Sequence, residues 1–139
     1  MAVKIVASKR DIQLEIHADE ESMIILGDKG GLSQVFINLI NNAVKFSPEG
    51  RSVNVTVKRE TEYASIAITD QGLGIPSEAL PHLFERFYRA ANITVAEIPG
   101  SGIGLYIVKS IIDELGGTIS VVSEVNHGTT FTVRLRLPE

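Results

Sequence analysis

The sequence predicts an α/β sandwich, in which about three helices cover one face of a mostly antiparallel sheet. Several short runs alternate apolar and polar residues, a pattern typical of half-buried strands. Two longer segments instead repeat apolar residues every three or four positions, which is typical of amphipathic helices. The alternating runs come in adjacent pairs joined by short turns, and this arrangement favours antiparallel pairing.

The first elements are a strand and a long helix. Residues 12–17 alternate and predict a strand, and the short apolar run at 23–26 suits an edge strand. From residue 32 to 43 the apolar residues follow helical spacing. Residues 47–50 contain proline and glycine, so the helix should end there.

The middle of the chain predicts a hairpin followed by irregular structure. The runs 53–57 and 64–68 alternate, and residues 60–62 between them suit a turn. Residues 70–76, with two glycines and a proline, should be irregular. Ser77 is placed to cap a short helix that ends at Leu80, before Pro81.

The last part predicts a second helix and a second hairpin. Residues 90–100 lack periodicity and should form a loop. Residues 101–115 carry a stripe of isoleucine and leucine, and the glycines that follow are typical helix terminators. Strands are expected near 118–124 and 129–137, joined by a turn at 125–128.

The composition indicates one globular domain and excludes several kinds of site. Hydrophobic residues make up 44% and charged residues 22% of the 139 positions, close to the soluble average. Because acidic residues outnumber basic ones and give a net charge of −4, we expect no nucleic-acid partner. The absence of cysteine excludes disulfides and thiolate metal sites. No apolar run approaches the roughly 18 residues of a membrane-spanning helix, so we expect no membrane contact by this domain.

Asn38, Asn42 and Lys45 form a polar stripe on the first long helix. At 100° per residue they lie within about 60° of one another, beside the apolar face. Amide oxygens are hard ligands that suit Mg²⁺, and the lysine supplies a positive charge for phosphate. The spacing shows that the three are adjacent and does not show that they bind a ligand, so the alternative of a solvated helix face stays open.

Two glycine-containing segments offer further binding chemistry. Asp70 follows a strand and can accept a hydrogen bond from an exocyclic amine, while Gly72 and Gly74 permit close backbone approach. Such residues are also common in ordinary turns. At residues 100–104, glycines open the second long helix, where free backbone N–H groups can bind an anion. The alternative there is a flexible hinge, and neither a dinucleotide-binding fingerprint nor a P-loop is present.

Taken together, these segments resemble the ATP-binding domain of sensor histidine kinases. The order and spacing of five motifs match: NLINNAVKFS (38–47) resembles the N box, DQGLGIP (70–76) the G1 box, LFERFYR (83–89) the F box, GSGIGL (100–105) the G2 box and GTTF (128–131) the last glycine motif. The wider superfamily has the Bergerat ATP-binding fold, shared with gyrase and the ninety-kilodalton heat-shock chaperone. The resemblance implies a mixed-sheet α/β sandwich, with a nucleotide bound between helices under a mobile lid.

The resemblance implies ATP and Mg²⁺ as cofactors. Asn42 would coordinate the Mg²⁺ that bridges the phosphates, with Asn38 beside it and Lys45 in contact with phosphate. Asp70 would bind the adenine amino group, and Arg89 would approach the γ-phosphate. The same motifs would supply the remaining nucleotide contacts: Phe46, Gly72, Gly74, Ile75, Gly100, Ser101, Gly102, Ile103, Gly104, Leu105 and Thr130.

Three of the implied roles concern aromatic residues and the last motif. Phe46 stands where the family commonly has tyrosine, which keeps the aromatic surface and loses the hydroxyl. Phe84 and Phe87 would anchor the lid. Thr130 would reach the adenine side through water.

The implied reaction is transfer of the γ-phosphate of ATP to a histidine. ATPases of the superfamily resemble one another in having glutamate at the position of Asn38, as a base for water. An amide cannot act as that base, which favours a histidine kinase over a hydrolase. Two alternatives stay open: a serine kinase of the anti-sigma-factor type, and an adenine-nucleotide-binding module without catalysis.

The acceptor histidine is expected on another domain. His17 lies in a strand pattern, while His82 and His127 lie at turns, so none fits an acceptor motif. We therefore expect residues 1–139 to be a single ATP-binding catalytic domain, monomeric and cytoplasmic, although the parent protein can carry a membrane anchor. Its partners would be the dimerisation and histidine-phosphotransfer domain of the same parent protein and a downstream response regulator.

Overall fold

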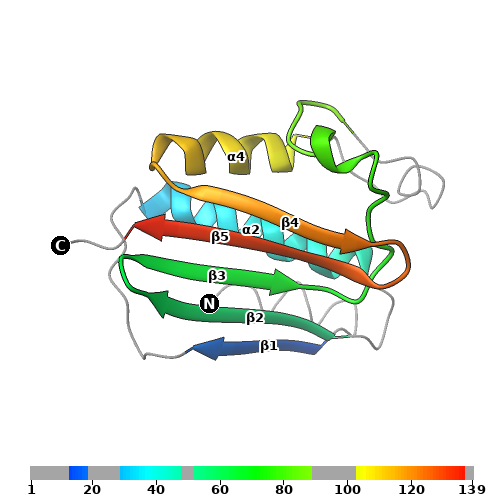
Figure 1. The fold of residues 1–139 in the computed structure, drawn as a ribbon, viewed down its shortest axis with the longest axis horizontal. Helices are drawn as coiled ribbons and strands as arrows, with labels where there is room; N and C mark the ends of the chain where they lie inside the picture. The colour runs from blue at the N-terminus through cyan, green and yellow to red at the C-terminus, as the bar shows by residue number, and fades with distance from the viewer. Residues whose placement is uncertain (1–12, 19–28, 48–51, 89–102, 137–139) are drawn as a thin grey trace.

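The computed structural model describes residues 13–18, 29–47, 52–88 and 103–136 (Figure 1). The elements follow the order β1 (Gln13–Ala18), α2 (Lys29–Phe46), β2 (Ser52–Glu60), β3 (Tyr63–Thr69), the short 3₁₀ helix η1 (Leu80–His82), α4 (Gly104–Glu114), β4 (Thr118–Glu124) and β5 (Gly128–Arg136). Most lie within a few residues of the predicted ones. The strand expected at 23–26 and the loop expected at 90–100 fall outside the described residues.

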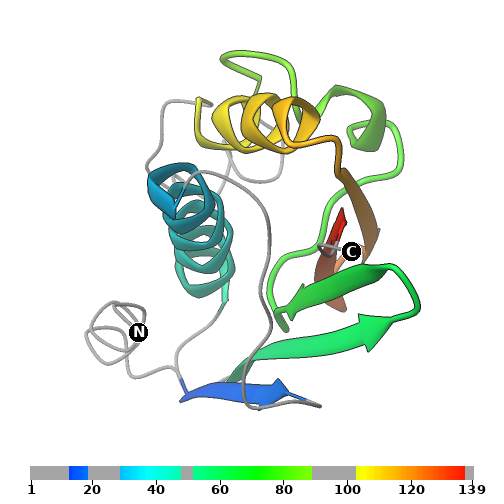
Figure 2. The same ribbon diagram turned by 90° about the vertical axis from the view of Figure 1, so that its left-hand side faces the viewer.

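The strands form one mixed sheet in the order β1-β2-β3-β5-β4. β1 runs parallel to β2, and every other pair is antiparallel, as predicted for a mostly antiparallel sheet. Figures 1 and 2 show α2 and α4 on the same side of the sheet, so the helices and the strands form two layers. The predicted α/β sandwich is confirmed. None of the helices in the described residues has the length and apolar character that crossing a bilayer requires.

The core lies between the two layers, where the predicted apolar faces meet. The helices contribute Leu39 and Ile112, both fully buried. Along β5 the side chains of Phe131, Val133 and Leu135 face the helices and are buried, while the residues between them face away. This period-two alternation decides which side chains can reach a site between sheet and helices.

Both long helices end where the sequence predicted. α2 ends at Phe46, and the hydroxyl of the buried Ser47 donates to the carbonyl of Ala43 at 2.7 Å. After α4, Gly116 adopts a φ of +73°, which glycine tolerates best. The N–H groups of Gly116 and Gly117 donate to carbonyls of the last helical turn at 3.1 and 3.0 Å, which satisfies them.

The short helix after the irregular loop differs from the prediction. We expected it to run from Ser77 to Leu80 and to stop before Pro81, but the helical residues are Leu80–His82 and include the proline. Residues 76–80 instead form turns, in which Ala79 donates to the carbonyl of Pro76 at 2.9 Å. Proline is tolerated in a first helical turn because N–H groups there have no intrahelical acceptor.

Candidate functional site

A pocket opens where α2, α4, β5 and the loop after β3 meet. Its lining residues are Asn42 and Phe46 from α2, Asp70, Leu73, Gly74 and Ile75 from the loop, Leu83, Leu105 from α4, and Thr129 and Phe131 from β5. Six of these ten were assigned to one site from the sequence. Most of the lining is apolar, and Asp70 is its only charged residue. A mostly apolar pocket with a few polar groups is typical of small-molecule sites.

Asp70 is held deep in this pocket by the backbone. Its side chain is 6% exposed, and its carboxylate accepts the N–H of Gly72 at 2.9 Å. Its own N–H donates to the carbonyl of Thr129 at 2.9 Å, which ties the loop to β5. Burial raises the pKa of Asp70 to about 6, although hydrogen bonds from the backbone of Gly72 and Thr129 act in the opposite direction. A buried carboxylate of this kind in a pocket is a candidate binding residue.

Two loop glycines allow protein segments to approach each other closely. A Cβ atom on Gly72 would lie 2.2 Å from the carbonyl oxygen of Phe46, so the loop packs against the end of α2. Gly74 has a φ of +71°, and a Cβ there would lie 2.0 Å from the carbonyl oxygen of Glu124. Gly74 lines the pocket and Gly72 does not. Both therefore shape the pocket through contacts with neighbouring backbone.

Only one of the three residues of the predicted polar stripe on α2 lines the pocket. Asn42 lines it, whereas Asn38 and Lys45, also half-buried, do not. The Lys45 ammonium lies 6.0 Å from the centroid of the Phe46 ring, at the border of the pocket. Asn42 thus places a side-chain amide, whose oxygen is a hard ligand for a cation such as Mg²⁺, at the pocket wall.

The start of α4 forms another part of the wall. Ile103 caps the helix, and Leu105 lines the pocket. A Cβ on Gly104, the first residue of α4, would meet no atom within 4 Å. Arg89 and residues 100–102 fall outside the described residues.

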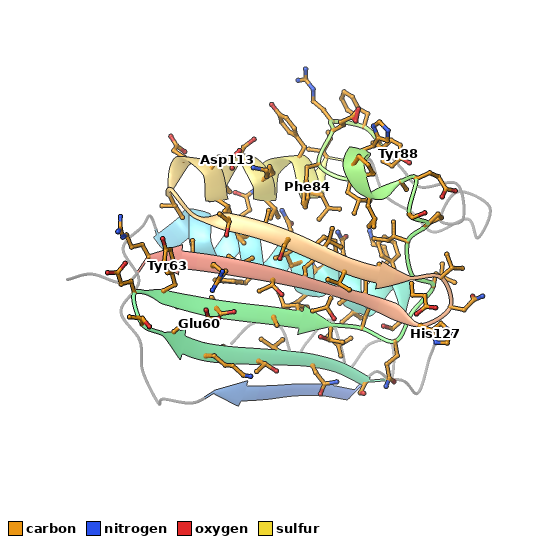
Figure 3. All side chains as sticks on the ribbon, in the orientation of Figure 1. Glu60, Tyr63, Phe84, Tyr88, Asp113 and His127 are labelled. Carbon is orange, nitrogen blue, oxygen red and sulfur yellow. The ribbon has the colours of Figure 1, made fainter. Side chains whose placement is uncertain are left out.

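The aromatic residues before this segment play unequal parts. Phe84, labelled beside the start of α4 in Figure 3, packs edge-on against Phe131 of β5 with ring centroids 6.4 Å apart. Phe87 is 63% exposed at a φ of +66°. The Arg86 guanidinium lies 5.7 Å from the Phe87 ring and 5.5 Å from the ring of Tyr106 on α4. Phe84 is therefore anchored to the core and Phe87 is exposed, while the lid that both were expected to anchor lies outside the described residues.

Thr129, and not the predicted Thr130, faces the pocket. Thr130 points to the opposite face of the sheet, where its hydroxyl lies 3.0 Å from the hydroxyl of Thr69. Thr129 shares the inward face with Phe131 and is 6% exposed. Strand alternation contains this signal, because an inward Phe131 requires Thr129 to point inward as well. Leu73, Leu83 and Phe131 were also absent from the predicted site.

Residues 27–139 match the family model described as "Histidine kinase-, DNA gyrase B-, and HSP90-like ATPase". The chain belongs to this family. Its ATPase domain is 38% identical over 126 residues to "Sensor histidine kinase YkoH" of Bacillus subtilis, covering 91% of the chain and 27% of that protein. It is 40% identical over 129 residues to "Heme sensor protein HssS" of Staphylococcus saprophyticus, covering 93% of the chain and 27% of that protein. The chain thus spans about a quarter of the length of these relatives.

Two solved structures share the fold of this ATPase domain. The "Mycobacterial sensor histidine kinase MprB" structure is 33% identical with a TM-score of 0.84, and the match covers 98% of the chain and 89% of that structure. "ShkA full-length in complex with AMPPNP" is 25% identical with a TM-score of 0.79, covering 98% of the chain and 30% of that structure. The chain is therefore a histidine kinase ATPase domain of the two-component type.

Proposed function

We propose that this domain binds Mg²⁺-ATP in the pocket described above and donates the γ-phosphate to a histidine on a separate dimerisation domain. The observation that carries the proposal is that one pocket holds both the buried carboxylate of Asp70 and the amide of Asn42. The neighbour ShkA is described in complex with AMPPNP, an analogue of ATP. A nucleotide with Mg²⁺ needs both kinds of group, one for the base and one for the cation.

Asp70 and the apolar walls suit an adenine ring. The carboxylate is an acceptor for the exocyclic amine of adenine, and it is ionised above a pH of about 6. Leu73, Ile75, Leu83 and Phe131 supply apolar contact for the ring. Gly72 and Gly74 fix the loop that carries the carboxylate and hold Asp70 in place.

Asn42 is the residue of this chain that would hold Mg²⁺. The described residues contain no group of three or more His, Cys, Asp or Glu side chains placed to hold a metal ion. A magnesium ion takes few protein ligands and completes its shell with phosphate oxygens and water, so one amide oxygen fits it. When bound, the ion neutralises charge on the phosphates. Asn38 and Lys45 lie one turn to either side of Asn42 on α2. Asn38 would lie beside the ion, and the positive charge of Lys45 would contact phosphate.

Residues outside the described part of the chain complete the proposal. Arg89 would approach the γ-phosphate, and backbone N–H groups of Gly100, Ser101 and Gly102 would cover the phosphates. Ile103, Gly104 and Leu105 would continue this cover, and Leu105 already lies in the pocket wall. Thr130 has no place in the proposed site, because its hydroxyl lies on the opposite face of the sheet.

The acceptor is proposed to be a histidine supplied by the parent protein. His82 is exposed at the end of η1 and His127 is exposed in the turn between β4 and β5, and the His82 ring pairs with Glu85. Neither lies in the pocket. We therefore propose that residues 1–139 are one catalytic domain, monomeric and cytoplasmic, that works with a dimerisation domain and a response regulator. Asn38 cannot act as a base for water, which favours phosphotransfer over hydrolysis.

Calorimetric titration with ATP, with and without Mg²⁺, tests the binding step. We expect Asp70→Asn to abolish measurable binding, and Asn42→Ala to remove most of the gain in affinity that Mg²⁺ brings. Ser120→Ala, a change on the opposite face of the sheet, is the matched control and should bind as wild type does. Wild-type protein that binds no adenine nucleotide would refute the proposal.

Phosphotransfer is tested with γ-labelled ATP and the domain joined to a histidine-bearing helical hairpin. Acid-labile label on histidine is the expected result. Acid-stable label on serine would favour the serine kinase alternative, and bound ATP without label would favour a binding module. Both of these outcomes contradict the proposed reaction and leave nucleotide binding intact.

A further inference from the structure

We infer that Ser123 is a positioning residue that fixes the direction of the Thr129 hydroxyl and thereby favours purines that carry an exocyclic amine. The inference rests on the proposed nucleotide-binding function. Ser123 lies on β4, behind the pocket wall, and is not among the lining residues. It therefore acts on the ligand only through its neighbours.

The Ser123 hydroxyl contacts three groups at once. It accepts the N–H of Ile75 at 2.7 Å, which ties the pocket loop to β4. It lies 3.0 Å from the carbonyl oxygen of Gly128 and 2.8 Å from the hydroxyl of Thr129. Two of these three neighbours, Ile75 and Thr129, line the pocket. Through these contacts Ser123 adds a second connection between the loop that carries Asp70 and β5, beside the hydrogen bond from the Asp70 N–H to the Thr129 carbonyl.

Counting protons sets the direction of each hydrogen bond. A serine hydroxyl has one proton and two acceptor positions. The Gly128 carbonyl can only accept, so the serine proton goes to it. The Ile75 N–H fills one acceptor position, which leaves the other for Thr129. Thr129 therefore donates its proton to Ser123 and presents only lone pairs to the pocket.

This arrangement places acceptors on two sides of the binding site. The Asp70 carboxylate is one, and the Thr129 oxygen is the other. Acceptors attract an N–H group, either directly or through one water molecule, and repel a carbonyl oxygen. A purine with an amine at the exocyclic position should therefore bind better than one with an oxygen there. Without Ser123, the Thr129 hydroxyl becomes free to turn and donate.

The test compares the affinities of the domain for ATP and for inosine 5′-triphosphate, which has an oxygen in place of the amine. The measured quantity is the ratio of the two dissociation constants. Ser123→Ala should lower the preference for ATP by about threefold to tenfold, the value of one hydrogen bond. Ser123→Thr keeps the hydroxyl and should keep the preference. Ser120→Ala, on the same strand but facing away, is the matched control.

Thr129→Val provides an independent arm that keeps Ser123 in place. It should lower the preference for ATP as Ser123→Ala does, and adding Ser123→Ala to it should change the preference no further. Equal weakening of both nucleotides by Ser123→Ala would show that Ser123 only supports the loop, and would overturn the inference. A wild-type domain that binds neither nucleotide would instead refute the proposed function itself.

Discussion

The buried carboxylate of Asp70 should make the ligand-free domain less stable at neutral pH than in mild acid. Burial raises the pKa of Asp70 from 3.8 to about 6 in the folded chain. Between these values the folded chain binds more protons than the unfolded chain, so the free energy of unfolding falls as the pH rises. At about 1.4 kcal/mol per pKa unit, the loss is about 3 kcal/mol and is complete above a pH of about 7.

Asp70→Asn removes this pH dependence because asparagine stays neutral. The asparagine NH₂ group would face one of the two backbone N–H groups that now donate to the carboxylate. That mismatch costs about 1–3 kcal/mol at every pH. Because this cost opposes the gain from removing the buried charge, the difference in unfolding free energy between variant and wild type at a single pH is a poor test. The unfolding free energy of the variant minus that of wild type should rise by about 2.4 kcal/mol between about pH 4 and pH 7.5, since the rest of the loss in wild type falls below pH 4.

Urea unfolding of both proteins across this range measures the difference directly. Other titrating groups act equally on the two proteins and cancel, including Glu60, whose pKa is lowered mainly by a hydrogen bond from Arg134. A difference that stays constant within about 0.5 kcal/mol would show that Asp70 titrates normally in the folded chain. The same variant should lose nucleotide binding, so a gain in relative stability would accompany a loss of function.

Three further predictions concern the loop, the core and the metal. Gly74→Ala should lower the free energy of unfolding by more than about 3 kcal/mol, because Gly74 has a positive φ and its Cβ would lie 2.0 Å from the carbonyl oxygen of Glu124. Gly104→Ala, where the Cβ would meet no atom within 4 Å, should be neutral or stabilise by up to about 1 kcal/mol. Equal effects of the two variants in urea unfolding would contradict this prediction. Leu39→Ala, in the buried face of α2, should cost about 2–5 kcal/mol, and Ile37→Ala, 39% exposed, about 0.5 kcal/mol or less. Asn42→Ala should leave thermal stability nearly unchanged while the affinity for ATP loses its Mg²⁺ dependence; a variant with full Mg²⁺ dependence would exclude Asn42 as the ligand.

Local patterns were enough to locate most elements of the fold. Helical spacing located α2 and α4, and period-two alternation located the strands, because each element must turn one apolar face to a common core. Gly116 ended α4 as predicted, since a left-handed residue is required there. Pro81 was misjudged, because a rule for the interior of a helix was applied to its first turn.

The sequence predicted those residues of the candidate site that belong to a recognisable motif. Asn42, Phe46 and Asp70 were each recognised within their own motif and meet in one pocket. Thr129 was missed, because choosing between neighbouring strand residues requires knowing which face of β5 meets the helices. Phe87 was expected to anchor a lid, and no local pattern shows that its side chain is exposed at a positive φ.

The sequence by itself determined the two-layer architecture, the family motifs and the residue types of the pocket, because these depend on periodicity and on short-range spacing. Only the tertiary structure decided how the pocket is built. Ser123 and Ile75 are 48 positions apart, and yet a 2.7 Å hydrogen bond joins them. The raised pKa of Asp70 likewise depends on burial by β5 and the loop, which no local pattern contains. Contacts between distant segments set the direction of hydrogen bonds and the charge of the site, and these contacts exist only after the layers have packed.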